Sequence, residues 1–316
     1  MAFTAADVKN LREMTGVGMM DCKKALEASD GDFDKAIDWL REKGLAAAQK
    51  KAGRVAAEGV AHAAVFDGVG VVVEVNAETD FVAKNEKFIG FVKGVAEAAA
   101  KFAPKDVEAL LDAKFPGSDK TVREQQQEMV LVIGENISTR RFERYADGIS
   151  VPYIHTGGRV GVLVNLEADG ISDTAAVTEL GRDLAMQIAA MKPLYLDKDS
   201  VDTAELEKER EIQLGIAIEE GKAKEEGKAK KLSEDKALEI ARKKVDGRIN
   251  KFYEEFCLMS QPFVKADKLS VAQHVEQTAK RLGGAIRIKA FTRYEKGEGI
   301  EKKQEDFAAE VASLIK

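Results

Sequence analysis

The chain is organised around Glu74-Val-Asn-Ala-Glu-Thr-Asp-Phe-Val-Ala-Lys84, where the sequence predicts that a strand runs into a helix through a polar loop. Every second residue from Val69 to Val75 is a valine, the period of two expected of a half-buried strand. After the loop, apolar residues recur at three- and four-residue steps from Phe88 to Ala99, as on the buried face of a helix. Residues 77 to 83 therefore form a strand-to-helix corner. Its one large aromatic, Phe81, is free to serve function because connections need not serve the core.

The corner has a counterpart later in the chain. Val160-Gly-Val-Leu-Val-Asn165-Leu-Glu-Ala-Asp169 repeats the pattern of residues 71 to 80, and an alanine-rich helical pattern follows each copy. Such a duplication predicts two similar halves in one body. The second copy has Gly170 where the first has Phe81. This asymmetry favours a specific interaction role for Phe81.

Composition narrows the class of protein. A chain of 316 residues, 45% hydrophobic and 33% charged, is typical of a soluble protein of two or three domains. The net charge of -6 argues against nucleic acid as a direct partner of the whole chain. The two cysteines lie far apart and form no CxxC pair, so we expect neither a disulfide framework nor a zinc site. With no signal pattern and no apolar run of membrane length, we expect a cytoplasmic protein without membrane contact.

The N-terminal part predicts three short helices over residues 4 to 44, the third closed by Gly44. A charged, alanine-rich stretch at 45 to 58 is typical of a partly helical linker. Asp67-Gly68 then separates two alternating runs, which is the strongest short signal for a β-hairpin. Residues 105 to 140 are predicted to be helical, with a break at Pro116-Gly117.

In the C-terminal part, apolar residues from Leu238 to Phe256 step by three or four. They predict an antiparallel helical hairpin over residues 203 to 256 with a polar tip. A helix around 271 to 282, a strand over 285 to 294 and a terminal helix over 307 to 315 follow. The strand places basic residues and an aromatic on one face, a pattern that fits surface decoration better than binding of single-stranded nucleic acid.

No constellation for covalent chemistry is present in the sequence. It lacks a phosphate-binding P-loop, a Gly-x-Ser-x-Gly elbow and a His-Glu-x-x-His helix. The three histidines, His62, His155 and His274, stand apart, whereas a metal site needs three or four donors. Gly157-Gly158 beside His155 fits either an anion cradle or a tight turn, and the turn is the more common explanation. We therefore expect no enzyme activity and no cofactor.

Several motifs resemble those of one family. Leu11-Arg-Glu-Met-Thr-Gly-Val-Gly-Met-Met-Asp-Cys-Lys-Lys-Ala-Leu26 is similar to the N-terminal signature of the elongation factor Ts family, and residues 74 to 84 are similar to its second signature. Further similar stretches are Ile133-Gly-Glu-Asn-Ile137, Gly158-Arg-Val-Gly161, Gly297-Glu-Gly-Ile-Glu301 and Asp306-Phe-Ala-Ala-Glu-Val311. The resemblance covers essentially the whole chain.

The resemblance implies an α+β fold with small antiparallel sheets. It implies a ubiquitin-associated-like three-helix module at 1–44, a linker at 45–58, a core N-subdomain at 59–145, a core C-subdomain at 146–202 and 257–296, an inserted coiled-coil hairpin at 203–256 and a C-terminal module at 297–316. The core would be a duplicated α/β body.

The resemblance also implies a function, namely guanine nucleotide exchange on the GTPase elongation factor Tu during translation elongation, with release of GDP and Mg²⁺. It assigns Thr79, Asp80, Phe81 and Val82 to displacement of that Mg²⁺, and Leu11, Met19, Met20, Ile133 and His155 to further partner contacts. Met19 and Met20 have an alternative role as filling of the small core. A homodimer through the hairpin, and an adaptor or chaperone-like protein without exchange activity, are the alternatives that stay open.

Overall fold

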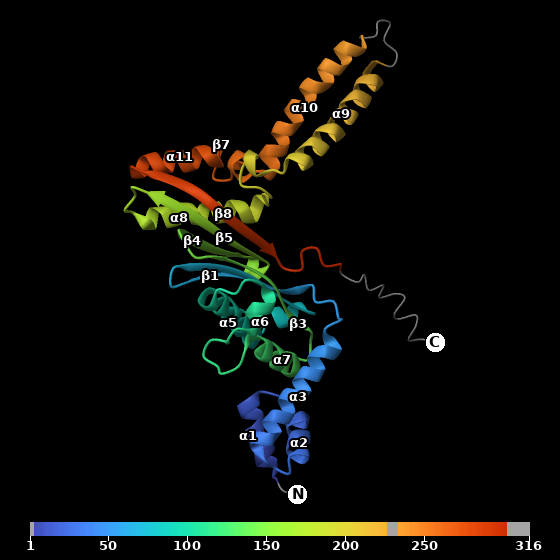
Figure 1. Cartoon of the computed structure of the whole chain (residues 1–316), viewed down its shortest axis with the longest axis vertical. Helices are drawn as coiled ribbons and strands as arrows, with labels where there is room; N and C mark the ends of the chain where they lie inside the picture. Colours follow the sequence, from blue (N-terminus) through green and yellow to red (C-terminus); the bar gives the residue numbers. More distant parts are fainter. Residues whose placement is uncertain (1–2, 226–232, 302–316) are drawn as a thin grey trace. The chain divides into compact units, whose positions relative to one another are not determined.

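The computed structural model describes residues 3–225 and 233–301. It combines helices with small antiparallel sheets, which confirms the predicted α+β class. Two compact units can be distinguished among the described residues (Figure 1). Unit 1 comprises residues 3–163 and 292–301, and unit 2 comprises residues 164–225 and 233–291. Within the described part of the chain, no helix is both long and apolar enough to cross a membrane.

Unit 1 begins with the three predicted helices, α1 (Ala5–Thr15), α2 (Met19–Ala28) and α3 (Phe33–Lys51). Thr4 and Asp7 form a capping box at the start of α1, and Gly16 ends this helix in the left-handed region at φ 71°, where glycine carries no Cβ penalty. Asp32 caps α3 through the backbone N–H of Lys35. A small apolar core joins the helices and includes Val8, Leu11, Val17, Cys22, Ala25, Leu26, Ala36 and Leu40.

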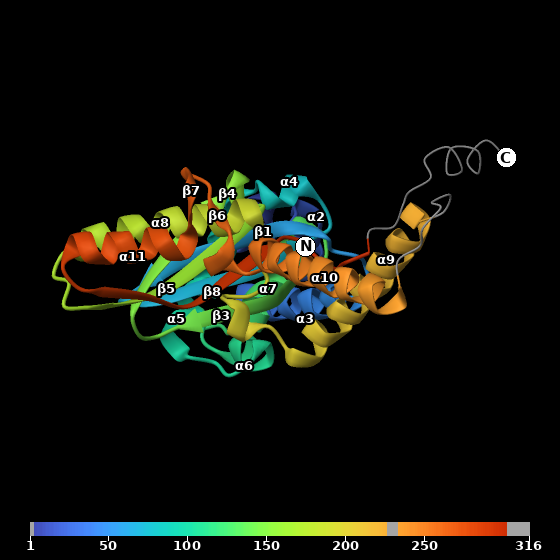
Figure 2. The ribbon, with the colours of Figure 1, turned by 90° about the horizontal axis from the view of Figure 1, so that it is seen from above.

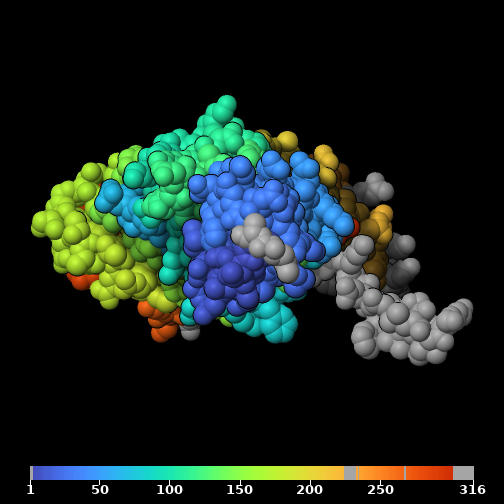
Figure 3. Space-filling view, turned by 90° about the horizontal axis from the view of Figure 1, so that it is seen from below, coloured from blue at the N-terminus to red at the C-terminus, as the bar shows by residue number. Residues whose placement is uncertain are grey.

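The predicted end of the third helix at Gly44 is wrong, because α3 continues to Lys51. Gly44 lies where α3 packs on α7 (Val122–Ile133), and a Cβ placed there would be 3.5 Å from the carbonyl oxygen of Gln127. Gly44 therefore lies inside α3, at its contact with α7, rather than at a helix end. In the space-filling view of Figure 3, the blue N-terminal helices border the green residues of the same unit.

The sheet of unit 1 has the strand order β1-β2-β3, with β1 (Glu58–Phe66), β2 (Val69–Ala77) and β3 (Ile137–Tyr145) all antiparallel. Asp67 and Gly68 both have positive φ, at 50° and 84°, as a type I′ turn requires. This confirms the predicted hairpin. One face of the sheet packs against α5 (Glu86–Phe102), with α6 (Val107–Asp112) and α7 beside it (Figure 1).

Two expectations about this sheet are wrong. Residues 137 to 140 are not helical, because Gly134 ends α7 at φ 86° and β3 starts three residues later. In addition, β2 is buried on both faces rather than half-buried. Its second face is covered within unit 1 by Leu163, which clusters with Ala63 and Val72, and by contact with β4 (Ile149–His155).

The second copy of the strand–helix pattern forms β5 (Val160–Asp169) and α8 (Thr174–Met191), which confirms the predicted repeat. The order of its sheet is β4-β5-β8, where β8 is Ala285–Glu295. In unit 2, α8 lies beside α11 (Val271–Leu282), as the views of Figures 1 and 2 agree. The short strands β6 (Pro262–Phe263) and β7 (Ala266–Ser270) precede α11. Single turns of 3₁₀ helix occur at Thr156–Gly158, Lys198–Ser200 and Leu258–Ser260.

The hairpin segment contributes two helices to unit 2, α9 (Thr203–Glu225) and α10 (Glu234–Phe256). The two helices pack together through a narrow apolar seam, in which Ala217 of α9 clusters with apolar residues of α10. An ion pair between Arg248 and Glu220 also joins them. The first residues of the predicted polar tip, 221–225, continue α9. The rest of the tip and the predicted terminal helix at 307 to 315 lie outside the described residues. The buried members of the seam are Ala217, Ala241, Val245 and Ile249.

Candidate functional site

The corner after β2 is built from two helix caps in succession. Thr79 caps α4 (Asp80–Ala83), a single helical turn, and its Oγ1 accepts from the backbone N–H of Val82 at 3.5 Å. Asn85 then caps α5 through the backbone N–H of Lys87 at 2.9 Å. Capping oxygens satisfy backbone donors that a helix start leaves unpaired. The backbone between the strand and α5 is therefore ordered by local hydrogen bonds.

The side chains of α4 point in opposite directions with respect to the core. Val82 is buried and joins the main apolar cluster of unit 1. Phe81 is 80% exposed, more than any other large hydrophobic side chain in the described residues. A large exposed aromatic on a firmly held turn is the kind of group that anchors protein–protein interfaces. The structure thus places the predicted interaction residue at the surface.

Asp80 lies next to the exposed aromatic and is itself exposed. Its carboxylate accepts from Lys84 Nζ at 2.8 Å. That hydrogen bond, together with the positive charge of Lys84, lowers the pKa of Asp80 below its ordinary value. The turn therefore presents a negative charge beside Phe81 at neutral pH.

A second stretch of chain holds the corner from the side. The backbone N–H and the hydroxyl of Thr79 donate to the two carboxylate oxygens of Glu135, at 3.0 Å and 2.8 Å. In return, Glu78 Oε1 accepts from the backbone N–H of Asn136 at 2.6 Å. Residues 78–79 and 135–136, which the sequence separates by more than fifty positions, are thus joined by reciprocal hydrogen bonds.

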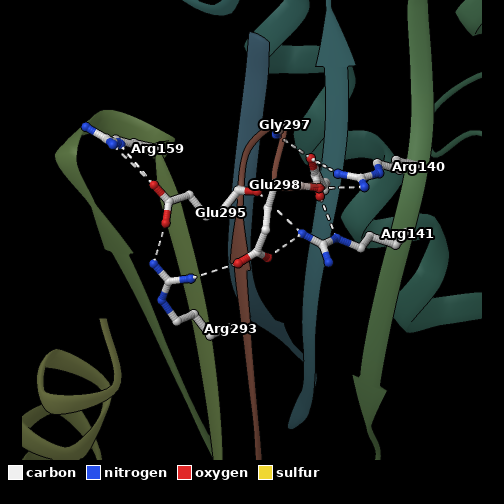
Figure 4. Close-up of polar contacts among 8 residues, drawn as sticks. Arg140, Arg141, Arg159, Arg293, Glu295, Gly297 and Glu298 are labelled. Atoms are coloured by element: carbon white, nitrogen blue, oxygen red, sulfur yellow. Dashed lines mark hydrogen bonds and ion pairs between the residues drawn. The ribbon is translucent and has the colours of Figure 1, made fainter. Parts of the chain in front are cut away.

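Behind the corner, β2 carries a fully buried carboxylate. Glu74 is 0% exposed and accepts from Arg140 Nη1 at 3.1 Å, Arg141 Nε at 2.5 Å and the backbone N–H of Gly297 at 2.8 Å. This group thus ties β3 to the segment that follows β8. Figure 4 shows Arg140 and Arg141 of β3 facing Gly297 and Glu298 of that segment. Burial opposes the charged form of Arg141, but the charges and hydrogen bonds of Glu74 and Glu298 together outweigh it, and the pKa of Arg141 is raised.

The segment after β8 fits closely into this network. Gly297 has φ 70°, and a Cβ there would approach the carbonyl oxygen of Ala57 to 2.0 Å, so only glycine is accommodated. Glu298 accepts from Arg141 Nη2 at 3.1 Å, and Arg159 pairs with Glu295 at 3.2 Å (Figure 4). Three stretches that carry the family resemblance, around residues 74, 159 and 297, therefore meet within unit 1.

The remaining predicted contact residues occupy different environments. Met19 and Met20 begin α2 with 43% and 63% of their surface exposed, so the interpretation that they fill the small core is wrong. Leu11, in contrast, is fully buried in that core. Ile133 is half-buried at the end of α7, where it packs against the main cluster.

His155 is exposed at the end of β4, and its Nδ1 lies 3.0 Å from the hydroxyl of Tyr153. The following glycines form a tight turn. Gly157 and Gly158 have φ of 62° and 95°, and a Cβ on Gly158 would lie 2.8 Å from Val60 Cγ1. The glycine pair is explained by this turn and by its close approach to β1.

Sequence reasoning missed the acidic partners of the corner, Glu135 and Glu78, and the buried role of Glu74. Each contact joins residues far apart in the chain, and no periodic pattern reports such a pairing. The only signal was that all three glutamates stand within stretches similar to the family's motifs. Among residues 3–225 and 233–301, no group of three or more histidine, cysteine, aspartate or glutamate side chains is arranged to hold a metal ion.

Comparison with known proteins identifies the family. A family model described as Elongation factor TS matches residues 78–298. The chain is 49% identical over 315 residues to Elongation factor Ts of Clostridium perfringens (strain ATCC 13124), covering 98% of each chain. It is 46% identical to Elongation factor Ts of Syntrophotalea carbinolica over 318 residues, covering all of both chains. It is 43% identical to that of Magnetococcus marinus, covering 100% of this chain and 99% of the relative. With relatives this similar along its whole length, the chain belongs to the elongation factor Ts family.

Proposed function

We propose that this protein is a guanine nucleotide exchange factor that acts on elongation factor Tu in the cytoplasm. Membership of the elongation factor Ts family supports the partner. The single observation that carries the mechanism is the exposure of Phe81 on a turn held by Thr79 and Val82. Such a side chain is available to enter a partner without unfolding its own support.

The proposed mechanism is displacement without covalent chemistry. A GTPase holds its nucleotide through backbone donors, a lysine and Mg²⁺. Mg²⁺ demands near-ideal octahedral geometry and tolerates little displacement of its ligands. Entry of Phe81 between elements that support the ligands of Mg²⁺ would disturb the ion and weaken the binding of GDP. Asp80 contributes a negative charge beside the wedge, while Thr79 caps the turn and Val82 anchors it in the core.

Further contacts extend the proposed partner surface. Met19 and Met20 are exposed, adaptable side chains suited to docking on the GTPase domain. Ile133 and His155 contribute from the ends of α7 and β4. Leu11 supports this surface from within the helical bundle, since a fully buried side chain cannot itself touch a partner in this conformation.

Binding of the factor and binding of GDP to the GTPase are thermodynamically linked. If the factor weakens GDP binding, then GDP weakens binding of the factor by the same ratio. Rebinding of GTP would therefore release the factor and allow it to act again. This behaviour distinguishes an exchange factor from a protein that only sequesters the GTPase.

The first experiment separates exchange from an adaptor role. Elongation factor Tu is loaded with fluorescent GDP and mixed in a stopped-flow instrument with excess unlabelled GDP, with and without this protein. We expect release to accelerate with factor concentration and then to saturate. An unchanged release rate at a concentration where the two proteins form a complex would contradict the exchange function and favour an adaptor or chaperone-like protein.

A further inference from the structure

The contact between the corner and the loop after α7 is unusually complete. Thr79 offers two donors, its backbone N–H and its hydroxyl, and the carboxylate of Glu135 accepts both, at 3.0 Å and 2.8 Å. The hydroxyl oxygen still accepts from the backbone N–H of Val82. Hydrogen bonds to an ionised acceptor are shorter and stronger than neutral ones. Thr79 is therefore fixed in position and in rotamer.

The contact is also reciprocal. Glu78 accepts from the backbone N–H of Asn136 at 2.6 Å, and Asn136 Nδ2 donates to the carbonyl oxygen of Arg54 at 2.8 Å. The guanidinium of Arg54 pairs with Glu78 at 3.5 Å. Each of the two stretches thus contributes an acid that accepts a backbone N–H of the other. We name the pair of contacts made by Glu135 and Glu78 the corner clamp.

An independent helical turn cannot hold Phe81 still. Nucleating a helix is unfavourable, and a helix of one turn has no stability of its own in water. The turn α4 consists of only 4 residues, so its shape depends on Thr79 as cap, on burial of Val82 and on the clamp. Phe81 lies one residue after Asp80 and makes no use of the core for its own orientation.

We propose that Glu135 is a positioning residue for nucleotide exchange: it holds Thr79 so that α4 presents Phe81 in the geometry needed for entry into the partner. This inference rests on the proposed function. The clamp also fixes the turn relative to Ile133, two residues before Glu135, so two of the proposed partner contacts keep a constant spacing. Without it, the turn samples other conformations and only a fraction of encounters place the aromatic correctly.

The test is a double-mutant cycle on release of fluorescent GDP from elongation factor Tu. Glu135→Ala and Thr79→Ala should each lower the maximal rate of release by about tenfold, the order expected for loss of a charged hydrogen-bonded contact. Both variants remove the bond between the Thr79 hydroxyl and the Glu135 carboxylate, although Thr79→Ala keeps the backbone N–H donor and also loses the cap to Val82. The loss in the double variant should therefore be clearly smaller than the product of the two single losses. The factor concentration at half-maximal rate should change by less than about threefold, since positioning acts on displacement rather than on docking.

Two variants serve as controls. Glu135→Gln keeps one oxygen acceptor for the Thr79 N–H and should retain most of the rate. Glu128→Ala removes an acid from α7 that pairs with Lys120 and not with the corner, and it should behave as the wild-type protein. Thermal unfolding of all variants shows whether a loss of rate reflects loss of the fold.

A readout independent of activity is amide hydrogen exchange over residues 78 to 85. The Glu135→Ala variant should exchange faster there by about tenfold while α11 stays unchanged. The clamp would be overturned if the two losses in the rate of GDP release multiply in the double variant. It would also be overturned if the amide hydrogens of residues 78 to 85 exchange in Glu135→Ala at the wild-type rate. A slow Phe81→Ala variant beside a fully active Glu135→Ala variant would overturn it while leaving the exchange function intact. If the wild-type protein does not accelerate GDP release from elongation factor Tu, both the positioning role of Glu135 and the proposed exchange function are overturned.

Discussion

At the scale of single residues, Phe81 is exposed on a turn that Glu135 holds through Thr79. A strand pattern, a helix pattern and a glycine at the equivalent position of the repeat together indicated an exposed aromatic, which the structure has at 80% exposure. Glu135 and Glu74 gave no comparable signal. Their partners lie 56 and 66 residues away, and a single sequence does not report which acid meets which donor.

Glu74 permits a prediction about stability. Replacing it by alanine leaves Arg140 and Arg141 without their buried acceptor and frees the backbone N–H of Gly297. Removing one partner of a buried, hydrogen-bonded ion pair is strongly destabilising. Glu74→Ala should therefore lower the free energy of unfolding by about 3 kcal/mol, measured by urea denaturation.

The control for this variant is Glu143→Ala, which removes an exposed glutamate from the same sheet. Surface changes of this kind stay within about 0.5 kcal/mol. If Glu74→Ala and Glu143→Ala have the same urea midpoint, the buried network does not stabilise unit 1 as described.

At the scale of elements, helices with clear caps and hairpins with Asp-Gly turns were predicted correctly. The errors occurred where a residue had two meanings. Gly44 follows an apolar helical pattern and therefore predicts a helix end, but it lies inside α3 against α7. Gly134 stands within an apolar run that predicts a continuous helix, but it ends α7. A glycine inside a helix and a glycine needed for positive φ look alike in one sequence.

The position of Gly44 leads to a prediction for α3. A Cβ there would make ordinary van der Waals contacts, with Gln127 O at 3.5 Å and Leu131 Cδ2 at 3.8 Å. Alanine is favoured over glycine within a helix by about 1 kcal/mol. Gly44→Ala should therefore raise the free energy of unfolding by about 0.5–1 kcal/mol, measured by urea denaturation.

A second glycine separates propensity from packing. Gly90 lies within α5, and a Cβ there meets no atom within 4 Å, so Gly90→Ala reports helix propensity alone. If Gly90→Ala stabilises the protein and Gly44→Ala destabilises it, the contact between α3 and α7 is tighter than the structure indicates, and our explanation of Gly44 fails.

At the scale of the whole molecule, the α+β class and the repeated strand–helix pattern followed from sequence, and the family followed from motifs spread along the chain. The proposed function joins two observations of different kinds. One is the family relationship, and the other is an exposed Phe81 on a turn that is supported by caps, by the corner clamp and by burial of Val82.

The proposed wedge role of Phe81 is tested by comparing Phe81→Ala with Phe102→Ala in the release of fluorescent GDP from elongation factor Tu. Phe102 is a half-exposed phenylalanine at the end of α5 and serves as the matched control. Phe81→Ala should fold normally and still bind the nucleotide-free GTPase. With Phe81→Ala, however, GDP release from the GTPase should be slower by on the order of tenfold or more, as expected for loss of a central anchor. With Phe102→Ala, GDP release should occur at the wild-type rate. If Phe81→Ala binds the GTPase and accelerates GDP release as much as the wild-type protein does, Phe81 is not the wedge.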